Sequence, residues 1–210
     1  MVFSVDYRLS PNNRFPDALN DCWQVYVWLL EQGEKHLGFP IKEIVLAGDS
    51  AGGNLIASIT QLSILKKYKR PLGLVMSYPA TYVSNKKFVP SLLLSLDDIL
   101  LPSRFLQFAL SAYKPEADVI SSLAQGLMSP LETDAGILKE FPTTLIQVSQ
   151  NDPLRDFGIL FAIKLKKLGV NVQLKEHLNV PHGCLNMNSP IFELKKEANN
   201  MIEECAQFIL

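Results

Sequence analysis

The sequence predicts an α/β fold in which a mostly parallel sheet carries helices on both faces. Three observations support this prediction. The chain has 210 residues and 48% hydrophobic content, enough for one large core rather than two. Short apolar runs alternate along it with longer segments of helical periodicity. One such run, residues 44–47, leads through a glycine-rich turn directly into a helical segment. We therefore expect residues 1–210 to form a single domain.

The first predicted elements are a short strand and a helix. Residues 2–7 have the pattern of a strand that begins almost at the first residue, and residues 8–16, rich in Asn and Pro, predict a loop. Asp17 then begins a helix that ends before Gly38. Apolar side chains recur along it at the spacing of one helix face, namely Leu19, Cys22, Trp23, Tyr26 and Leu30.

The best-defined element is the strand, turn and helix that start at residue 44. Residues 44–47 predict a buried strand, and residues 48–52, centred on Ser50, match the G-x-S-x-G nucleophile elbow. In this motif a serine sits on a strained turn with its hydroxyl exposed at the carboxyl end of a sheet. We expect Gly48 and Gly52 to be required because a Cβ at either would collide with the neighbouring strand or helix. The helix that follows presents one apolar face, formed by Leu55, Ile59, Leu62 and Leu65.

The rest of the chain resumes the alternation after one long interruption. Further strands are expected at residues 72–77, 143–148 and 170–174, the last being half-exposed and near a sheet edge. Further helices are expected at residues 157–168 and 191–208. The interruption, residues 80–140, is rich in leucine and phenylalanine and predicts mostly helix. Its apolar content suits either a lid over an apolar pocket or packing against the sheet.

The loops after the predicted strands bring reactive side chains to one edge of the sheet. In an open parallel sheet the carboxyl ends of the strands share one face, where catalytic groups collect. Ser50, Asp152 and His182 each follow a predicted strand on that face. A serine hydroxyl needs an imidazole to take its proton, and the imidazole needs a carboxylate to fix its tautomer. These three are the candidate catalytic residues, and the N–H of Ala51 at the helix start is the candidate oxyanion donor.

Other titratable residues compete for these roles. Asp156 lies in the same loop as Asp152 but stands where it could cap the next helix. Asp49 is expected to organise the turn beside the serine. His36 lies near a helix end and His177 lies within a strand pattern, so we expect a structural or solvent-facing role for both.

Composition excludes several classes of partner. The net charge of −1 gives no reason to expect nucleic acid or an anionic membrane surface. The three cysteines are widely spaced and form no metal-ligand pattern, so we expect reduced thiols in a cytoplasmic protein without a metal site. The most apolar stretch, residues 92–101, is interrupted by Asp97 and Asp98 and is too short to span a bilayer. We therefore expect no transmembrane segment.

Several short motifs occur in a defined order and span nearly the whole chain. They are VDYRLSP at residues 5–11 with Phe15-Pro16, GDSAGGN at 48–54, SPL at 129–131, DPLRD at 152–156 and PHG at 181–183. In this combination the chain resembles the hormone-sensitive lipase family of α/β-hydrolases.

The resemblance implies an α/β-hydrolase fold and a cofactor-free carboxylic-ester hydrolase that acts on acylglycerols or other lipid or short-chain esters. Ser50 would form an acyl-enzyme, His182 would act first as a base and then as an acid, and Asp152 would orient His182. Residues 80–140 would correspond to a partly helical cap insertion beside the acyl pocket.

The sequence departs from the family pattern in one important respect. The family places a His-Gly-Gly motif, which supplies most of the oxyanion hole, upstream of the Tyr-Arg-Leu segment, and the chain begins after that point. We therefore expect an N-terminally incomplete domain that lacks the first strands and this oxyanion loop, with impaired activity. Two alternatives stay open: a catalytically silent binding module of the same fold, and a nonfunctional fragment. The acyl chain, the alcohol and the oligomeric state are not predicted.

Overall fold

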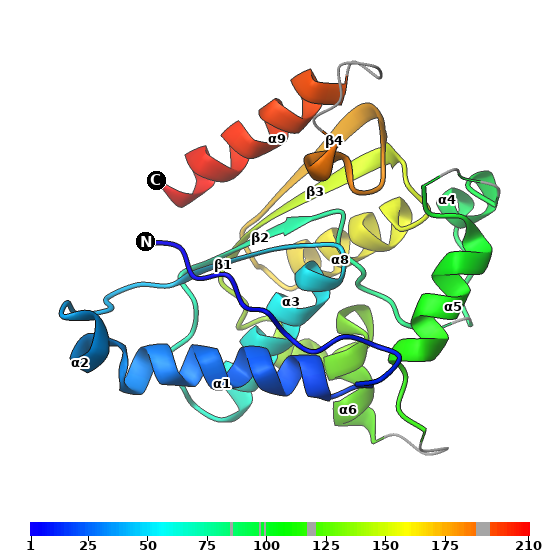
Figure 1. Cartoon of the computed structure of the whole chain (residues 1–210). Helices are drawn as coiled ribbons and strands as arrows, with labels where there is room; N and C mark the ends of the chain where they lie inside the picture. Colours follow the sequence, from blue (N-terminus) through cyan, green and yellow to red (C-terminus); the bar gives the residue numbers. More distant parts are fainter. Residues whose placement is uncertain (85, 97, 99, 117–120, 188–193) are drawn as a thin grey trace.

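The sheet of the computed structural model is parallel, as the alternation predicts. The structure describes residues 1–84, 86–96, 98, 100–116, 121–187 and 194–210. In this part of the chain a four-stranded sheet has the order β1-β2-β3-β4, so sequence neighbours are also neighbours in the sheet (Figure 1). Each strand pairs with the next in parallel, which requires a crossover connection between them. The strands are β1 (Val45–Asp49), β2 (Gly73–Ser77), β3 (Thr143–Asn151) and β4 (Val172–Pro181).

Helices cover both faces of this sheet. One face carries α1 (Asp17–Glu31), α3 (Ala51–Leu65) and α8 (Arg155–Lys167), and α9 (Leu194–Ile209) lies on the other (Figure 1). The short α2 (Gly33–Leu37) follows α1. The predicted fold class, a parallel sheet between two helical layers, is thus confirmed. Of the predicted last helix, residues 191–193 lie outside the described residues.

The segment between β2 and β3 is helical, as its composition predicts. It contains α4 (Pro90–Leu94), α5 (Ser103–Tyr113), α6 (Ser122–Met128), the 3-10 helix η1 (Pro130–Glu132) and α7 (Ala135–Leu138). Asp97, one of the two charges in the apolar stretch of residues 92–101, lies outside the described residues. In the portion of the chain that is described, no helix is both long and apolar enough to cross a membrane.

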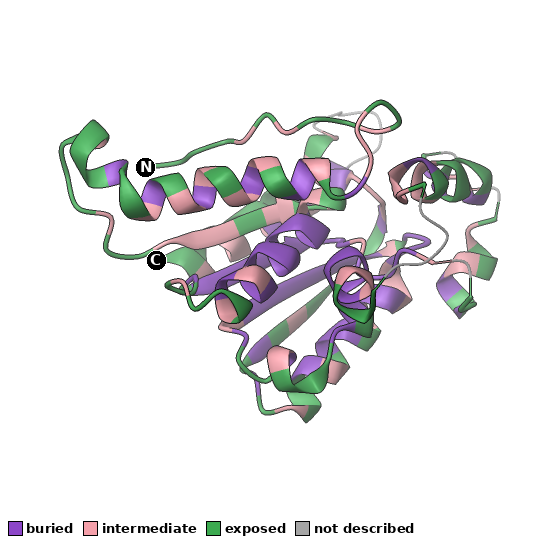
Figure 2. Ribbon diagram, turned by 90° about the horizontal axis from the view of Figure 1, so that it is seen from below, coloured by how far each residue is buried: buried purple, intermediate pink, exposed green. Residues whose placement is uncertain are grey.

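The core consists of three clusters that hold the layers together. The largest lies between the sheet and the α3–α8 side and includes Met76, Ile146 and Phe161, each fully buried. A second joins α1 to α3, and a third lies under α9. Figure 2 shows the middle of the sheet and α3 almost entirely buried, whereas buried and exposed residues alternate along α1. Burial on this scale is the main favourable term in folding.

Three expectations about these elements are wrong in detail. Residues 2–7 form no strand, because among the described residues no strand pairs with them; they run along α1, where Val5 and Tyr7 pack on the second cluster (Figure 1). Strand β1 is only partly buried because it is the edge of the sheet. Helix α3 is buried on nearly all sides instead of one face, and Leu65 at its end is exposed.

Candidate active site

Ser50 sits on a strained turn between β1 and α3. Its backbone has φ 51° and ψ −114°, a conformation that is rare for a residue other than glycine. The end of β2 holds it there, since the Ser50 N–H donates to the Ser77 carbonyl at 2.9 Å and the Ser50 carbonyl accepts from the Ala80 N–H at 3.0 Å. The predicted elbow conformation is therefore present, and the serine side chain is half-buried at the carboxyl end of the sheet.

Crowding around the elbow explains one of the two motif glycines. A Cβ on Gly48 would lie 2.4 Å from the carbonyl carbon of Gly52, so only glycine fits at position 48. A Cβ on Gly52 would meet only the Asp49 Oδ1, at 4.0 Å, so the predicted steric reason is wrong for Gly52. The crowded position is its neighbour Gly53, where a Cβ would lie 2.7 Å from the Cβ of Pro79.

Asp152 and His182 directly follow two paired strands and lie side by side. Asn151, the last residue of β3, pairs with Pro181, the last residue of β4, so the residues that follow them are neighbours. The Nδ1 of His182 lies 2.8 Å from the Oδ2 of Asp152, and its Nε2 lies 2.9 Å from the Oγ of Ser50. With Nδ1–H donating to the carboxylate, Nε2 is left to accept the serine proton. The structure thus joins the three predicted residues by two hydrogen bonds.

Asp152, and not Asp156, is the carboxylate that faces the histidine. Asp152 is fully buried, and its second oxygen, Oδ1, accepts from the Leu154 N–H at 2.7 Å. Asp156 instead accepts from the Ser91 N–H at 2.8 Å, which ties α4 to the first turn of α8. The suggestion that Asp156 caps α8 is wrong, because the N-cap position is Leu154 and carries no side-chain cap.

The N–H of Ala51 is available at the serine. Ala51 is the first residue of α3 and is exposed, and the N–H groups of a first helical turn have no partner within the helix. They also carry the positive end of the helix dipole. This N–H therefore suits a developing negative charge beside Ser50.

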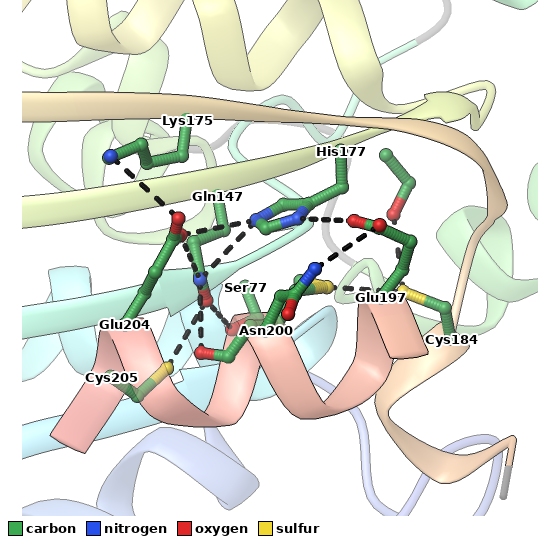
Figure 3. A network of polar contacts seen from close by, with 11 residues as sticks. Ser77, Gln147, Lys175, His177, Cys184, Glu197, Asn200, Glu204 and Cys205 are labelled. Atoms are coloured by element: carbon green, nitrogen blue, oxygen red, sulfur yellow. Dashed lines mark hydrogen bonds and ion pairs between the residues drawn. The ribbon is translucent and has the colours of Figure 1, made fainter. Parts of the chain in front are cut away.

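The other two histidines lie away from Ser50. His36 is exposed in α2, where its ring stacks on Trp28. His177 is buried in β4 beneath α9, with Nδ1 3.5 Å from Glu197 Oε2 and Nε2 3.3 Å from Glu204 Oε2 (Figure 3). His36 thus lies in a helix and His177 within a strand, as the sequence pattern predicts, and His177 belongs to the contact between α9 and the sheet.

Two cavities of about 400 Å³ lie elsewhere on the molecule. One is at the amino ends of the strands, between Lys42, Arg70 and Glu140. The other lies beside His177 and Glu204 under α9. Neither is lined by Ser50, Asp152 or His182. Across the described residues, no group of three or more His, Cys, Asp or Glu side chains is arranged to hold a metal ion.

Three residues that support the site escaped the sequence analysis. The Asn54 amide donates to the carbonyls of Ala80 and Met128, both at 2.8 Å, and so fastens α3 to the segment after β2. Ser129 accepts from the Val83 N–H at 2.8 Å within the same segment. Tyr78, the residue after β2, packs its ring against His182. Asn54 and Ser129 lie within the GDSAGGN and SPL motifs, a signal that could have marked them.

Comparisons with known proteins identify the fold of the chain. A family model described as alpha/beta hydrolase fold matches residues 1–186. Ethyl acetate hydrolase of Pseudomonas putida is 32% identical over 98% of this chain, and hormone-sensitive lipase of Mus musculus is 40% identical over 53% of it. The structure of carboxyl esterase 2 from the mycorrhizal fungus Tuber melanosporum matches 85% of this chain with a TM-score of 0.78 and 34% identity. The chain spans 62% of the Pseudomonas relative, 14% of the mouse relative and 57% of the fungal structure.

Proposed function

The chain belongs to the alpha/beta hydrolase fold family, and on this premise we propose that it hydrolyses carboxylic esters through Ser50, His182 and Asp152. The observation that carries the proposal is the pair of hydrogen bonds, at 2.9 Å and 2.8 Å, that link the three side chains in the order serine, histidine, aspartate. The relatives are named esterases and lipases, which supports the same class of reaction.

Acylation would begin at the Ser50 hydroxyl. As Oγ attacks the ester carbonyl carbon, Nε2 of His182 takes its proton, and the carbonyl oxygen becomes an oxyanion that accepts from the Ala51 N–H. When the tetrahedral intermediate collapses, the bond to the alcohol oxygen breaks, and the imidazolium returns its proton to the leaving alcohol. The acyl group then remains on Ser50.

Deacylation would repeat these steps with water in place of the serine hydroxyl. His182 takes a proton from water as it attacks the acyl carbon, and then protonates Ser50 as the acid product leaves. Throughout, the buried Asp152 carboxylate holds the Nδ1–H of His182 and stabilises the imidazolium. Its second oxygen is fixed by the Leu154 N–H, so the carboxylate cannot turn away from the ring.

The proposed substrates are lipid or short-chain esters, acylglycerols among them. Relatives include one named for ethyl acetate and one named as a lipase, which supports a range of apolar esters. We propose that residues 80–140 form a cap beside the acyl group. Large apolar side chains are exposed on its helices, namely Leu93, Leu94, Phe105 and Phe108. The three unpaired cysteines are consistent with a reducing compartment such as the cytoplasm, and the proposal needs no cofactor.

Hydrolysis of p-nitrophenyl esters tests this proposal. The purified chain is assayed with acetate and octanoate esters, beside Ser50→Ala and the matched control Ser4→Ala, an exposed serine. Release of p-nitrophenol by wild type and Ser4→Ala, but not by Ser50→Ala, is the expected result. A folded wild-type chain that releases no more product than Ser50→Ala would overturn the proposal and favour a binding module. The ratio of the two ester rates reports the preferred acyl length.

A further inference from the structure

Tyr78, the residue after β2, lies next to Ser50 and has a strained backbone conformation. Asp49, the last residue of β1, pairs with Ser77, the last residue of β2, so Ser50 and Tyr78 are neighbours at the same edge. Tyr78 has φ 36°, a genuine outlier for a bulky side chain, and its N–H donates to the Gln147 carbonyl at 2.7 Å. Strain of this kind persists only where the surroundings enforce it, and it is concentrated at functional sites.

This strain directs the aromatic ring at the histidine. The centroids of the Tyr78 and His182 rings are 4.9 Å apart with an interplanar angle of 61°, an edge-to-face contact. Tyr78 is 1% exposed and shares a cluster with Val180 and Cys184, which lie on either side of His182 in the sequence. One side of the imidazole is therefore covered by a ring that is itself fixed.

The hydroxyl of Tyr78 reaches back to the elbow. It lies 3.4 Å from the Oδ2 of Asp49, the residue before the serine. Burial, and after it the negative charge of Asp49, raise the pKa of Tyr78 well above its usual value, so the hydroxyl remains a donor. One side chain thus touches the elbow through its hydroxyl and the histidine loop through its ring.

We propose that Tyr78 is a positioning residue that holds the His182 imidazole with Nε2 facing the Ser50 hydroxyl. The hydrogen bonds of His182 lie at the edge of the ring, at Nδ1 and Nε2, so they leave the imidazole some freedom to tilt about its Cβ–Cγ bond. The Tyr78 ring removes this freedom from the side. The consequence for rate rests on the proposed ester hydrolysis, whereas the consequence for the imidazole does not.

A residue that merely fills the core would affect stability but not the imidazole, so the test observes the imidazole directly. Histidine-selective ¹⁵N NMR follows the Nδ1–H signal of His182, assigned by its loss in His182→Ala. The variants are Tyr78→Phe, which keeps the ring, and Tyr78→Leu, which removes it. Tyr82→Leu is the matched control, because Tyr82 is also 1% exposed and packs its ring on Phe157 rather than on a histidine.

The expected result is a His182 Nδ1–H signal that broadens or disappears in Tyr78→Leu and stays sharp in Tyr78→Phe and Tyr82→Leu. If Tyr78→Leu does not fold, Tyr78→Met, whose unbranched side chain fills irregular space, takes its place. An unchanged signal in the folded variant without a ring would overturn the proposal, as would an equal loss in Tyr82→Leu.

Kinetics provides the second arm. The rate of Ser50 modification by a fluorophosphonate should fall by about 10²-fold in Tyr78→Leu, since small misplacement of a catalytic group has effects of this order. Tyr78→Phe loses one long hydrogen bond and should fall by less than about tenfold. For ester turnover, kcat should decrease while KM stays near that of wild type. If wild type itself is not modified, the proposed function fails, and the NMR arm still decides the role of Tyr78.

Discussion

His177 lies in β4 and His182 directly after it, but their ring nitrogens face different groups. At His177 both nitrogens face carboxylates, those of Glu197 and Glu204, and the ring is buried between the sheet and α9 (Figure 3). At His182 one nitrogen faces the carboxylate of Asp152 and the other faces a serine hydroxyl. The first arrangement fastens a helix to a sheet, and the second can move a proton.

A histidine that acts as a base needs one ring nitrogen with a free lone pair. A ring can donate to carboxylates at both nitrogens only when both carry a proton, and it then has no lone pair left to accept another. A ring with one carboxylate and one hydroxyl partner keeps a lone pair for the hydroxyl proton in its neutral form. Burial and charged neighbours alone would have favoured His177, so the partner atoms decide the assignment.

The largest expected effect comes from exchanging the two histidines for alanine in turn. His182→Ala removes the proposed base, and the rate of fluorophosphonate attachment to Ser50 should fall by more than about 10⁴-fold. His177→Ala should leave that rate close to wild type, since its partners belong to α9. The rates are measured by intact-protein mass spectrometry over time. Similar losses in the two variants would break the distinction between the two histidines.

The two aspartates that follow β3, Asp152 in the loop and Asp156 in the first turn of α8, give the next largest difference. Asp152→Asn turns the partner of His182 into an amide and should lower the attachment rate by up to about 10⁴-fold, because the neutral ring then loses its correct tautomer. Asp156→Asn, four positions further along, weakens a contact with Ser91 and should change the rate little. A greater loss in Asp156→Asn than in Asp152→Asn would mean that Asp156, and not Asp152, is the acid that orients His182.

Substitution of His177 should lower the stability of the fold, although it leaves the rate of attachment to Ser50 nearly unchanged. His177→Gln weakens two contacts between β4 and α9 and should lower the free energy of unfolding by about 1–3 kcal/mol. The control on the same strand is Lys175→Gln, whose exposed ion pair with Glu204 should be worth less than about 1 kcal/mol. Urea denaturation followed by circular dichroism measures both. A His177→Gln protein as stable as wild type would mean that the contacts at His177 do not fasten α9.

The smallest expected difference concerns two thiols, Cys184 near His182 and Cys205 in α9. Cys184 lies two residues after His182 and is fully buried, whereas Cys205 is half-buried and contacts Gln147, which in turn contacts His177. Burial raises the pKa of both thiols, so each carries less thiolate than a free cysteine at pH 8 and should react slowly with iodoacetamide. Peptide mapping should find Cys205 modified before Cys184, and both rates should rise as the pH is raised. Earlier modification of Cys184 would mean that the His182 loop opens more readily than α9.

Much of this site could be predicted because its information is local. Each of Ser50, Asp152 and His182 follows an apolar strand, and parallel strands bring their carboxyl ends to one edge whatever lies between them. The glycine at position 48 and the helix after the serine are equally local signals, since a crowded turn permits no other residue. The sequence favoured Asp152 over Asp156 by its place directly after the strand, and the pairing of Asn151 with Pro181 at the ends of β3 and β4 is the physical reason that Asp152 lies beside His182.

The features that were missed depend on distant partners. Residues 2–7 have the pattern of a strand, but a strand also requires a hydrogen-bonded neighbour, which no local pattern provides. The burial of His177 depends on Glu197 and Glu204, which belong to a helix formed much later in the chain. The role of Tyr78 follows from its pairing beside Ser50 and from a positive φ that the sequence of β2 does not reveal.

The site of fluorophosphonate attachment shows directly whether Ser50 is the nucleophile that His182 activates. The wild-type chain, Ser50→Ala and His182→Ala are each treated with the probe, digested, and sequenced by mass spectrometry. We expect one adduct, on Ser50, which is absent from Ser50→Ala and forms far more slowly in His182→Ala. An adduct on another residue, or attachment to Ser50 at the same rate with and without His182, would contradict this expectation.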